Sequence, residues 1–307
     1  MVQYADDGLT KRQLDPAELF HHGWEDRMPD SKRVRQLGDI RVTALEDGYG
    51  DAPIAVVVNI DEAGAAALVE LSSGADLLHP VFNAYLIEIS DRPLLIDAGA
   101  GVHMGPNAGK MLENLAEARV APGDVEAIFL THCHPDHILG IVDGDWNAVF
   151  PNAELVVPEL DEQFWLRSDF SKIDNEYQRL ETERAQKAAA SYSGRTRTIS
   201  GGAVAPGVTM VPLPGHTPGH SGYMLEGGGN KLFLWGDIVH FPTFQAARPD
   251  ASLVFDVDAP LARETRKQTF ERVIADGLEV GGGHLLAPGF GRVERAGTVY
   301  RIVPPDR

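Results

Sequence analysis

A cluster of metal-ligating side chains lies in residues 131–137, THCHPDH. In an extended chain, residues two apart point to the same side, so His132 and His134 can bind one ion together while the cysteine between them points away. The proline that follows suits a turn or a first helical position, which turns Asp136 and His137 toward a second ion. Four potential ligands in one turn predict two adjacent metals, although clustered histidines can also be plain polar loop residues.

Three more ligand-type residues stand at the ends of expected strands or in glycine turns. His216 lies in PGHTPGH, Asp237 ends FLWGD and His284 ends GGGH. Because strand ends of one sheet share an edge, we expect these side chains on one rim with the histidine cluster.

Strand-like and helix-like stretches alternate along the chain. The second helix within 159–190, over 174–191, is polar enough to lie on the surface. Two sets of strands, each with helices, predict an α/β (α+β) fold, a four-layer αββα sandwich of two similar halves. Residues 1–37 read as a polar N-terminal extension and 38–307 as a single domain. We expect strands at 38–48, 81–89, 93–101, 125–137, 208–220, 221–226, 231–237 and a last core strand at 278–284, and helices at 109–120, twice within 159–190, and at 261–277.

Composition narrows the possible partners. The 27 basic and 45 acidic residues give a net charge of −18, which disfavours nucleic acid and anionic membranes. The N-terminal stretch holds no apolar run long enough for a signal peptide or membrane span, so we expect a cytoplasmic protein. A single cysteine, Cys133, excludes intramolecular disulfides and cysteine-rich zinc modules. Histidine and carboxylate must therefore hold any metal.

The motifs THCHPDH, PGHTPGH, LWGD and GGGH, in this order, resemble those of the metallo-β-lactamase superfamily of metal-dependent hydrolases. From about Gly38 to Val303 the chain looks most like the methyl parathion hydrolase branch, which is related to the N-acyl homoserine lactonases. This resemblance implies two divalent ions, with zinc first and manganese, iron or cobalt also suited to the ligands. It assigns His132, His134 and His216 to one metal, Asp136, His137 and His284 to the other, and Asp237 as the bridge.

The resemblance also implies a reaction. A hydroxide held between the two metals would attack a carbonyl carbon or phosphorus, with Asp136 and Asp237 in the catalytic centre. A bridging Asp237 argues against a β-lactamase, and the negative charge argues against the ribonucleases of the superfamily. We expect a small-molecule ester substrate, either a lactone or an aryl ester. The alternatives are an organophosphate triester hydrolase and a non-catalytic metal-binding protein of the same fold.

Four further residues are candidates for supporting roles. Asp97 matches a position where a carboxylate supports the metal cluster, although it can also be an ordinary turn residue. His240, three residues after Asp237, stands where the lactonases place a tyrosine, so it could donate to an oxyanion or be structural. Trp165 matches an aromatic substrate-pocket position, and Met104 falls where methyl parathion hydrolase has a phenylalanine. Core packing is the alternative for both.

The sequence does not decide the roles of two further residues or the oligomeric state. Leu139 replaces the first glycine of the DHxGG pattern usual in relatives, which affects the loop behind the metals more than the ligands. His103 follows a glycine turn and could approach the site. Because close relatives are often dimers, a homodimer is a further expectation.

Overall fold

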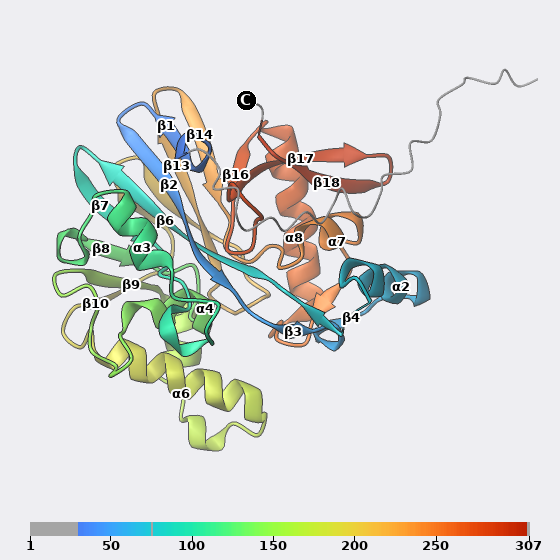
Figure 1. Cartoon of the computed structure of the whole chain (residues 1–307), viewed down its shortest axis with the longest axis horizontal. Helices are drawn as coiled ribbons and strands as arrows, with labels where there is room; N and C mark the ends of the chain where they lie inside the picture. Colours follow the sequence, from blue (N-terminus) through green and yellow to red (C-terminus); the bar gives the residue numbers. More distant parts are fainter. Residues whose placement is uncertain (1–29, 75, 306–307) are drawn as a thin grey trace, which may run out of the picture.

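The computed structural model describes residues 30–74 and 76–305, in which two seven-stranded sheets dominate (Figure 1). The first sheet contains, in spatial order, β1 (Val34–Leu37), β2 (Ile40–Tyr49), β6 (Val81–Ile89), β7 (Arg92–Ile96), β8 (Ala127–Phe129), β9 (Glu154–Pro158) and β10 (Thr196–Ile199). The second contains β11 (Gly202–Ala205), β12 (Val208–Pro212), β13 (Ser221–Gly227), β14 (Asn230–Leu234), β16 (Glu279–Gly281), β17 (Phe290–Ala296) and β18 (Val299–Val303). Two short ladders pair β3 (Ala52–Pro53) with β5 (Leu77–Leu78), and β4 (Val57–Val58) with β15 (Ser252–Leu253).

Helices cover the outer faces of both sheets (Figure 1). The first core cluster joins the first sheet to α3 and α6, and the third joins the second sheet to α8. Between the sheets lies another core cluster, built from apolar residues of both. The predicted four-layer αββα sandwich is confirmed. The helices are α2 (Glu62–Leu71), α3 (Met111–Glu117), α4 (Pro135–Ile138), α5 (Glu159–Asp161), α6 (Glu176–Ala190), α7 (Pro242–Ala247) and α8 (Ala259–Ala275), with a π-helical turn at Glu162–Leu166 after α5.

The strand β6 shows why the sequence forms this sandwich. Its residues are buried on both faces because alternate side chains enter different cores. Ala84 and Leu86 belong to the cluster beneath α3 and α6, whereas Tyr85 and Ile87 belong to the cluster between the sheets. A near-continuous apolar strand is what a central position between two cores requires.

Strand direction determines where functional side chains can meet. In the first sheet β7, β8, β9 and β10 run parallel, and in the second β14 runs parallel to β16. The segments that follow β7, β8, β14 and β16 therefore leave at the carboxyl edges of their sheets. Asp97 follows β7 directly, THCHPDH follows β8, Asp237 follows β14 and His284 follows β16.

The structure differs from the sequence expectations at several boundaries. Strand β8 ends at Phe129, before the histidine cluster, and Pro135 begins α4 with an extended His134 before it. The stretch 278–284 is not the last strand, because β17 and β18 follow it and complete the second sheet. At the N-terminus the sheet begins with β1 at Val34, inside the stretch 1–37 that was expected to be an extension, and residues 1–29 of that stretch lie outside the described part.

A satellite apolar cluster contains α2, α7 and the two short ladders. The sequence expectations did not include α2, whose N-cap Asp61 accepts a hydrogen bond from the Gly64 N–H. Across residues 30–74 and 76–305, we find no helix with the length and apolar character that crossing a membrane requires.

Candidate metal centre

The seven predicted ligands converge at the rim in two groups. His132, His134 and His216 form the first, with His134 Nδ1 lying 3.0 Å from His132 Nε2 and 2.9 Å from His216 Nε2. The second group contains Asp136, His137, Asp237 and His284. Segments that are far apart in the sequence thus supply one compact cluster of imidazoles and carboxylates.

Asp237 lies between the two groups. Its Oδ2 atom is 3.2 Å from His137 Nε2 and 3.1 Å from His284 Nε2, on the side of the second group. The same oxygen is 3.6 Å from the Nε2 atoms of both His132 and His216 in the first group. One carboxylate is therefore within reach of both groups.

Hydrogen bonds on the far side of each ring fix which nitrogen faces the cluster. His137 Nδ1 lies 2.8 Å from Asp97 Oδ2, His216 Nδ1 lies 2.8 Å from Asp256 Oδ1, and His284 Nδ1 lies 2.7 Å from the Val81 carbonyl. These acceptors take an N–H from Nδ1, which leaves Nε2 with its lone pair toward the cluster.

Asp97 anchors the edge of the first sheet as well as a ligand. It accepts hydrogen bonds from the Thr131 backbone N–H at 2.7 Å and the Thr131 hydroxyl at 2.9 Å. The Thr131 hydroxyl, which is a donor to Asp97, can then accept from His132 Nδ1 at 3.0 Å. Asp97 thus contacts the loop that carries the ligands and the His137 ring.

A buried carboxylate that sequence reasoning missed connects two ligand loops. Asp161 Oδ2 accepts from the Cys133 N–H at 2.8 Å, and Oδ1 accepts from the Gly219 N–H at 2.7 Å. Burial raises the pKa of Asp161 to about 6, and these hydrogen bonds oppose that rise. A Cβ atom at Gly219 would lie 2.4 Å from the Asp161 nitrogen, so this approach requires glycine.

Sequence reasoning also missed Asp256, because it lies in a segment with no periodic pattern. In the fold, residues 256–258 lie beside residues 215–216, and the Val257 N–H donates a hydrogen bond to the His216 carbonyl. This packing brings Asp256 next to the His216 ring. Cys133, by contrast, is fully buried in the first core cluster, in agreement with the prediction that it points away from His132 and His134.

Burial and the neighbouring carboxylates act on the pKa values of the two groups in different ways. Burial lowers the pKa of His132 and His134 well below the usual value, so both rings are neutral. Burial alone would lower the pKa of His137 too, but the carboxylates of Asp237, Asp136 and Asp97 outweigh it and raise that pKa. Burial would raise the pKa of Asp237, but the charge on His137 and His284 lowers it. This carboxylate is ionised.

The donor set fits divalent metal ions. The acceptors beside His132 and His216 hold the N–H on the opposite nitrogen of each ring, so both Nε2 atoms present lone pairs to His134 Nδ1. A single N–H at His134 Nδ1 cannot fully satisfy both of them. In addition, Asp237 Oδ1 and His134 Nε2 are buried and have no hydrogen-bond partner in the described part of the chain. A cation shared by these lone pairs would satisfy the nitrogens, and Asp237 could offer its second oxygen.

His240 packs directly against this cluster. Its Nε2 lies 3.0 Å from Asp237 Oδ2, and its ring stacks on His284 at 4.5 Å between centroids. Burial lowers the pKa of His240 to about 4, so the ring is neutral. With His216 and Asp237 it forms a third potential ligand group. The structure therefore places His240 against the cluster, and its predicted role as a donor to an oxyanion stays a prediction.

The two predicted pocket residues occupy different places. Trp165 is buried in the first core cluster and also meets the His134 ring edge-on at 5.0 Å. Met104 packs against the outside of the same cluster and is partly buried. His103 stacks on Trp146 and lies 2.9 Å from the Asp143 carbonyl, so these contacts hold its ring in the loop.

Leu139 explains how the DHxGG departure is tolerated. Its φ angle is −71°, which any residue adopts, and its side chain is fully buried in the first core cluster. The next residue cannot vary in this way, since a Cβ at Gly140 would lie 1.8 Å from the Ala98 carbonyl oxygen. The substitution adds core packing behind the ligands.

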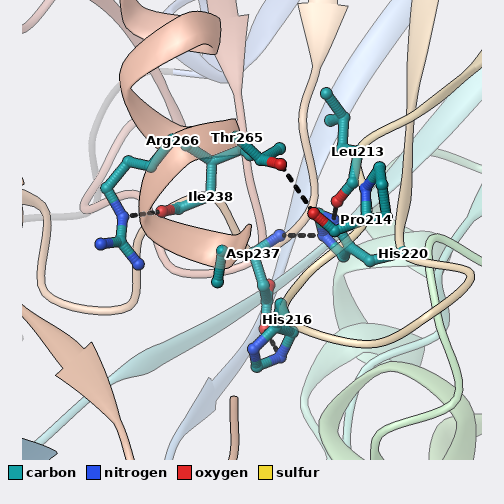
Figure 2. Close-up of a pocket in the computed structure, with 9 residues that line it drawn as sticks. Leu213, Pro214, His216, His220, Asp237, Ile238, Thr265 and Arg266 are labelled. Carbon is teal, nitrogen blue, oxygen red and sulfur yellow. Dashed lines mark hydrogen bonds and ion pairs between the residues drawn. The ribbon is translucent and has the colours of Figure 1, made fainter. Parts of the chain in front are cut away.

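Figure 2 shows the residues that pack behind Asp237, on the backbone side of this ligand. His220 accepts from the Asp237 N–H at 2.8 Å and donates from Nδ1 to the Leu213 carbonyl at 2.8 Å. From α8, buried Arg266 donates to the Ile238 carbonyl at 2.7 Å. These bonds hold the backbone on both sides of Asp237.

An αββα sandwich with two groups of potential metal ligands at its rim is typical of a family of metal-binding proteins. Comparison with known families shows which family this is. The profile of the metallo-beta-lactamase superfamily matches residues 82–293. The chain therefore belongs to this superfamily.

Solved structures support the assignment over nearly the whole chain. The chain is similar to hydrolase AbOPH in the beta lactamase superfamily, with a TM-score of 0.82 and 32% identity over 92% of this chain and 99% of that one. It also shares its fold with AidC, described as a dizinc quorum-quenching lactonase, with a TM-score of 0.81 and 24% identity over 89% of this chain and 97% of that one.

Curated relatives match over a shorter region. An uncharacterized protein YobT of Bacillus subtilis (strain 168) is 31% identical over 48% of this chain and 58% of its own length. A probable metallo-hydrolase of Mycobacterium tuberculosis (strain ATCC 25618 / H37Rv), Rv2300c, is 25% identical over 50% of this chain and 54% of its own length. The matched region thus spans little more than half of these relatives.

Proposed function

We propose that this protein is a metal-dependent hydrolase that uses two divalent ions, with zinc the first choice, to cleave an ester bond in a lactone or aryl ester. The observation that carries the proposal is the position of Asp237 Oδ2, 3.1–3.6 Å from the Nε2 atoms of histidines in both ligand groups. A carboxylate placed between two groups of imidazole nitrogens and carboxylate oxygens suits a pair of adjacent ions.

In this proposal His132, His134 and His216 hold one ion, Asp136, His137 and His284 hold the other, and Asp237 contacts both. Bound there, two ions would activate water and polarise the substrate carbonyl. The acceptors Asp97, Asp256 and the Val81 carbonyl hold an N–H on Nδ1 of His137, His216 and His284, so that Nε2 of each ring is the ligating atom.

The protein's own groups would handle the substrate and the proton. Asp136 has 14% of its side chain exposed, against 1% for Asp237, so in this proposal Asp136 is the carboxylate that takes up the proton, at Oδ2. His240 is neutral and buried, and its Nε2 lies 3.0 Å from Asp237 Oδ2. In this proposal its N–H would be donated to the carbonyl oxygen that becomes negative once the ions engage that carboxylate. Trp165 forms part of the apolar wall beside His134. We further propose Met104 as a more distant wall residue.

The structural neighbours support a lactone substrate. AidC and another N-acyl homoserine lactone hydrolase were solved with the product N-hexanoyl-homoserine, in the latter case at the catalytic metal centre. For this chain, lactone cleavage is our proposal. A homodimer and a cytoplasmic location stay predictions.

A substrate panel tests the proposal. Metal-loaded protein should hydrolyse a lactone or an aryl ester with kcat/KM at least about tenfold above that for a methyl paraoxon-like triester, or ~1.4 kcal/mol of transition-state preference. A planar ester forms one oxyanion, which His240 can meet, whereas a triester needs room for three substituents. His240→Leu should reduce ester turnover more than triester turnover.

His79→Leu is the matched control, because His79 is 47% exposed and pairs with Asp51 on the surface. Equal or better triester turnover, with His240→Leu harmless to both reactions, would favour a phosphotriesterase. Bound metal with no hydrolysis of any ester would favour a non-catalytic metal-binding protein.

A further inference from the structure

The three histidines of the first ligand group lie on loops from different halves of the sandwich. His132 and His134 lie on the loop after β8 in the first sheet, and His216 lies on the loop before β13 in the second. The contacts between the two segments follow one order, because each step toward the ligands on one loop meets a step backward along the other. The two segments therefore run side by side in opposite directions and form a seam.

Direct hydrogen bonds hold this seam at the end that is nearer to the sheets. The Tyr223 hydroxyl donates to the Leu130 carbonyl at 2.7 Å. The Ser221 N–H donates to the Thr131 carbonyl at 2.9 Å. These contacts bring the two backbones within hydrogen-bond distance of each other just before the ligands begin.

At the next position along the seam, both backbones present a donor. The N–H groups of Cys133 and Gly219 cannot bond to each other, because neither is an acceptor. The Asp161 carboxylate joins them, with Oδ2 accepting from Cys133 at 2.8 Å and Oδ1 accepting from Gly219 at 2.7 Å. One side chain at the end of α5 thus binds one loop with each of its oxygens.

This carboxylate fits closely into the seam. A Cβ atom at Gly219 would lie 2.4 Å from the Asp161 nitrogen and 2.9 Å from its Oδ1. Gly219, Cys133 and Asp161 are all buried. Because two buried N–H groups without an acceptor are unfavourable, the loops keep the spacing at which the carboxylate serves both.

The ligands of the first group follow directly after this contact. His134 is the next residue after Cys133, and its Nδ1 lies 2.9 Å from His216 Nε2 on the opposite loop. The ligands of the second group on the same segment have a separate anchor, since the Ala98 N–H donates to the His137 carbonyl at 2.9 Å. The spacing at Asp161 therefore bears on the first group.

We propose that Asp161 is a positioning residue that sets the distance between these two loops and thereby the affinity of the first ligand group for its ion. A carboxylate suits this role, because a neutral amide offers one acceptor oxygen rather than two. Groups that orient metal ligands from outside the coordination sphere have large effects on metal affinity. The inference rests on the proposed two-ion centre.

Metal titration of variants that keep one ion tests it. His284→Ala should keep an ion in the first group and His216→Ala an ion in the second, so competition with a chromophoric chelator measures each dissociation constant separately. Adding Asp161→Asn to His284→Ala should raise the constant at least about tenfold, because the amide leaves one loop without its acceptor. Adding it to His216→Ala should change the constant by less than about threefold.

Asp47→Asn in the His284→Ala background is the matched control. Asp47 is 1% exposed, and its carboxylate also accepts from backbone N–H groups, those of Ala100 and Met111 at 2.8 Å each. These donors lie outside the two loops of the seam. Asp47→Asn should therefore lower the urea unfolding free energy, as Asp161→Asn does, and leave the dissociation constant of the first group within about threefold.

Two further measurements address the same contact. Gly219→Ala should weaken the first group selectively, since its Cβ displaces the carboxylate. In metal-loaded wild type the amides of Cys133 and Gly219 should exchange with deuterium at least as slowly as that of Ser221, and fast exchange of either would overturn the inference. Unchanged affinity of the first group in both variants, or equal weakening of both groups, would also overturn it and leave the proposed function intact. Wild type that binds no divalent ion would overturn both.

Discussion

Replacing Asp256 with Asn tests whether the carboxylate behind His216 strengthens one metal group specifically. Asp256 Oδ1 lies 2.8 Å from His216 Nδ1, and its side chain is 1% exposed. Burial would raise the pKa of Asp256, but the hydrogen bond and charge of His216 outweigh it and lower the pKa. The carboxylate is therefore ionised and accepts a charge-assisted hydrogen bond from the ring.

Asparagine keeps the size of the side chain and an acceptor oxygen, and its amide is neutral. Asp256 Oδ2 also accepts from the Leu253 N–H at 2.9 Å, so one remaining acceptor would have to serve two donors. Losing a partner of this kind costs about 10–100-fold in metal affinity, or ~1.4–2.8 kcal/mol. The loss should fall on the group formed by His132, His134 and His216.

Competition with a chromophoric chelator measures both dissociation constants. In Asp256→Asn the constant for one ion should rise about 10–100-fold, while that for the other stays within about threefold. Asp250→Asn is the control, because the Asp250 side chain is 65% exposed and pairs with Lys267. Unchanged affinity for both ions would refute the reasoning, and equal weakening of both would mean that Asp256 supports the fold rather than one site.

Three further predictions concern the metal number, the bridge and the layer behind it. Fully loaded wild type should hold about two metal equivalents per chain and His284→Ala should lose one preferentially, whereas a ratio of one in wild type by elemental analysis would remove the two-site assignment. Asp237→Ala should weaken metal retention and lower kcat by several orders of magnitude with nearly unchanged far-UV circular dichroism, and near-normal turnover would mean that the bridging assignment is wrong. Because burial lowers the pKa of His220 to about 4 from 6.5, the folded metal-free protein resists protonation, so its stability is full above pH 6.5 and falls as the pH drops toward 4. Between pH 7 and pH 5, the unfolding free energy measured with urea should fall by about 2 kcal/mol less in His220→Gln than in wild type. The same pH dependence in both proteins would contradict the assignment.

The sequence determined the features that depend on local spacing. The periods of apolar residues identified the central strands and α8, because burial on one or two faces repeats along a strand or helix whatever its partners. The alternation in THCHPDH likewise sets the direction of neighbouring side chains, which is why Cys133 enters the core while His132 and His134 reach the cluster. Pro135 at the first position of α4 is a local preference of the same kind.

Only the tertiary structure decided which distant groups support these ligands. Asp161 and Asp256 have no distinctive spacing, and their roles depend on how α5 and the segment before α8 pack against the loops that carry Cys133, Gly219 and His216. A hydrogen bond between residues 40 or 58 positions apart leaves no periodic trace in the sequence, because it is fixed by the meeting of sheet edges rather than by the repeat of one strand or helix.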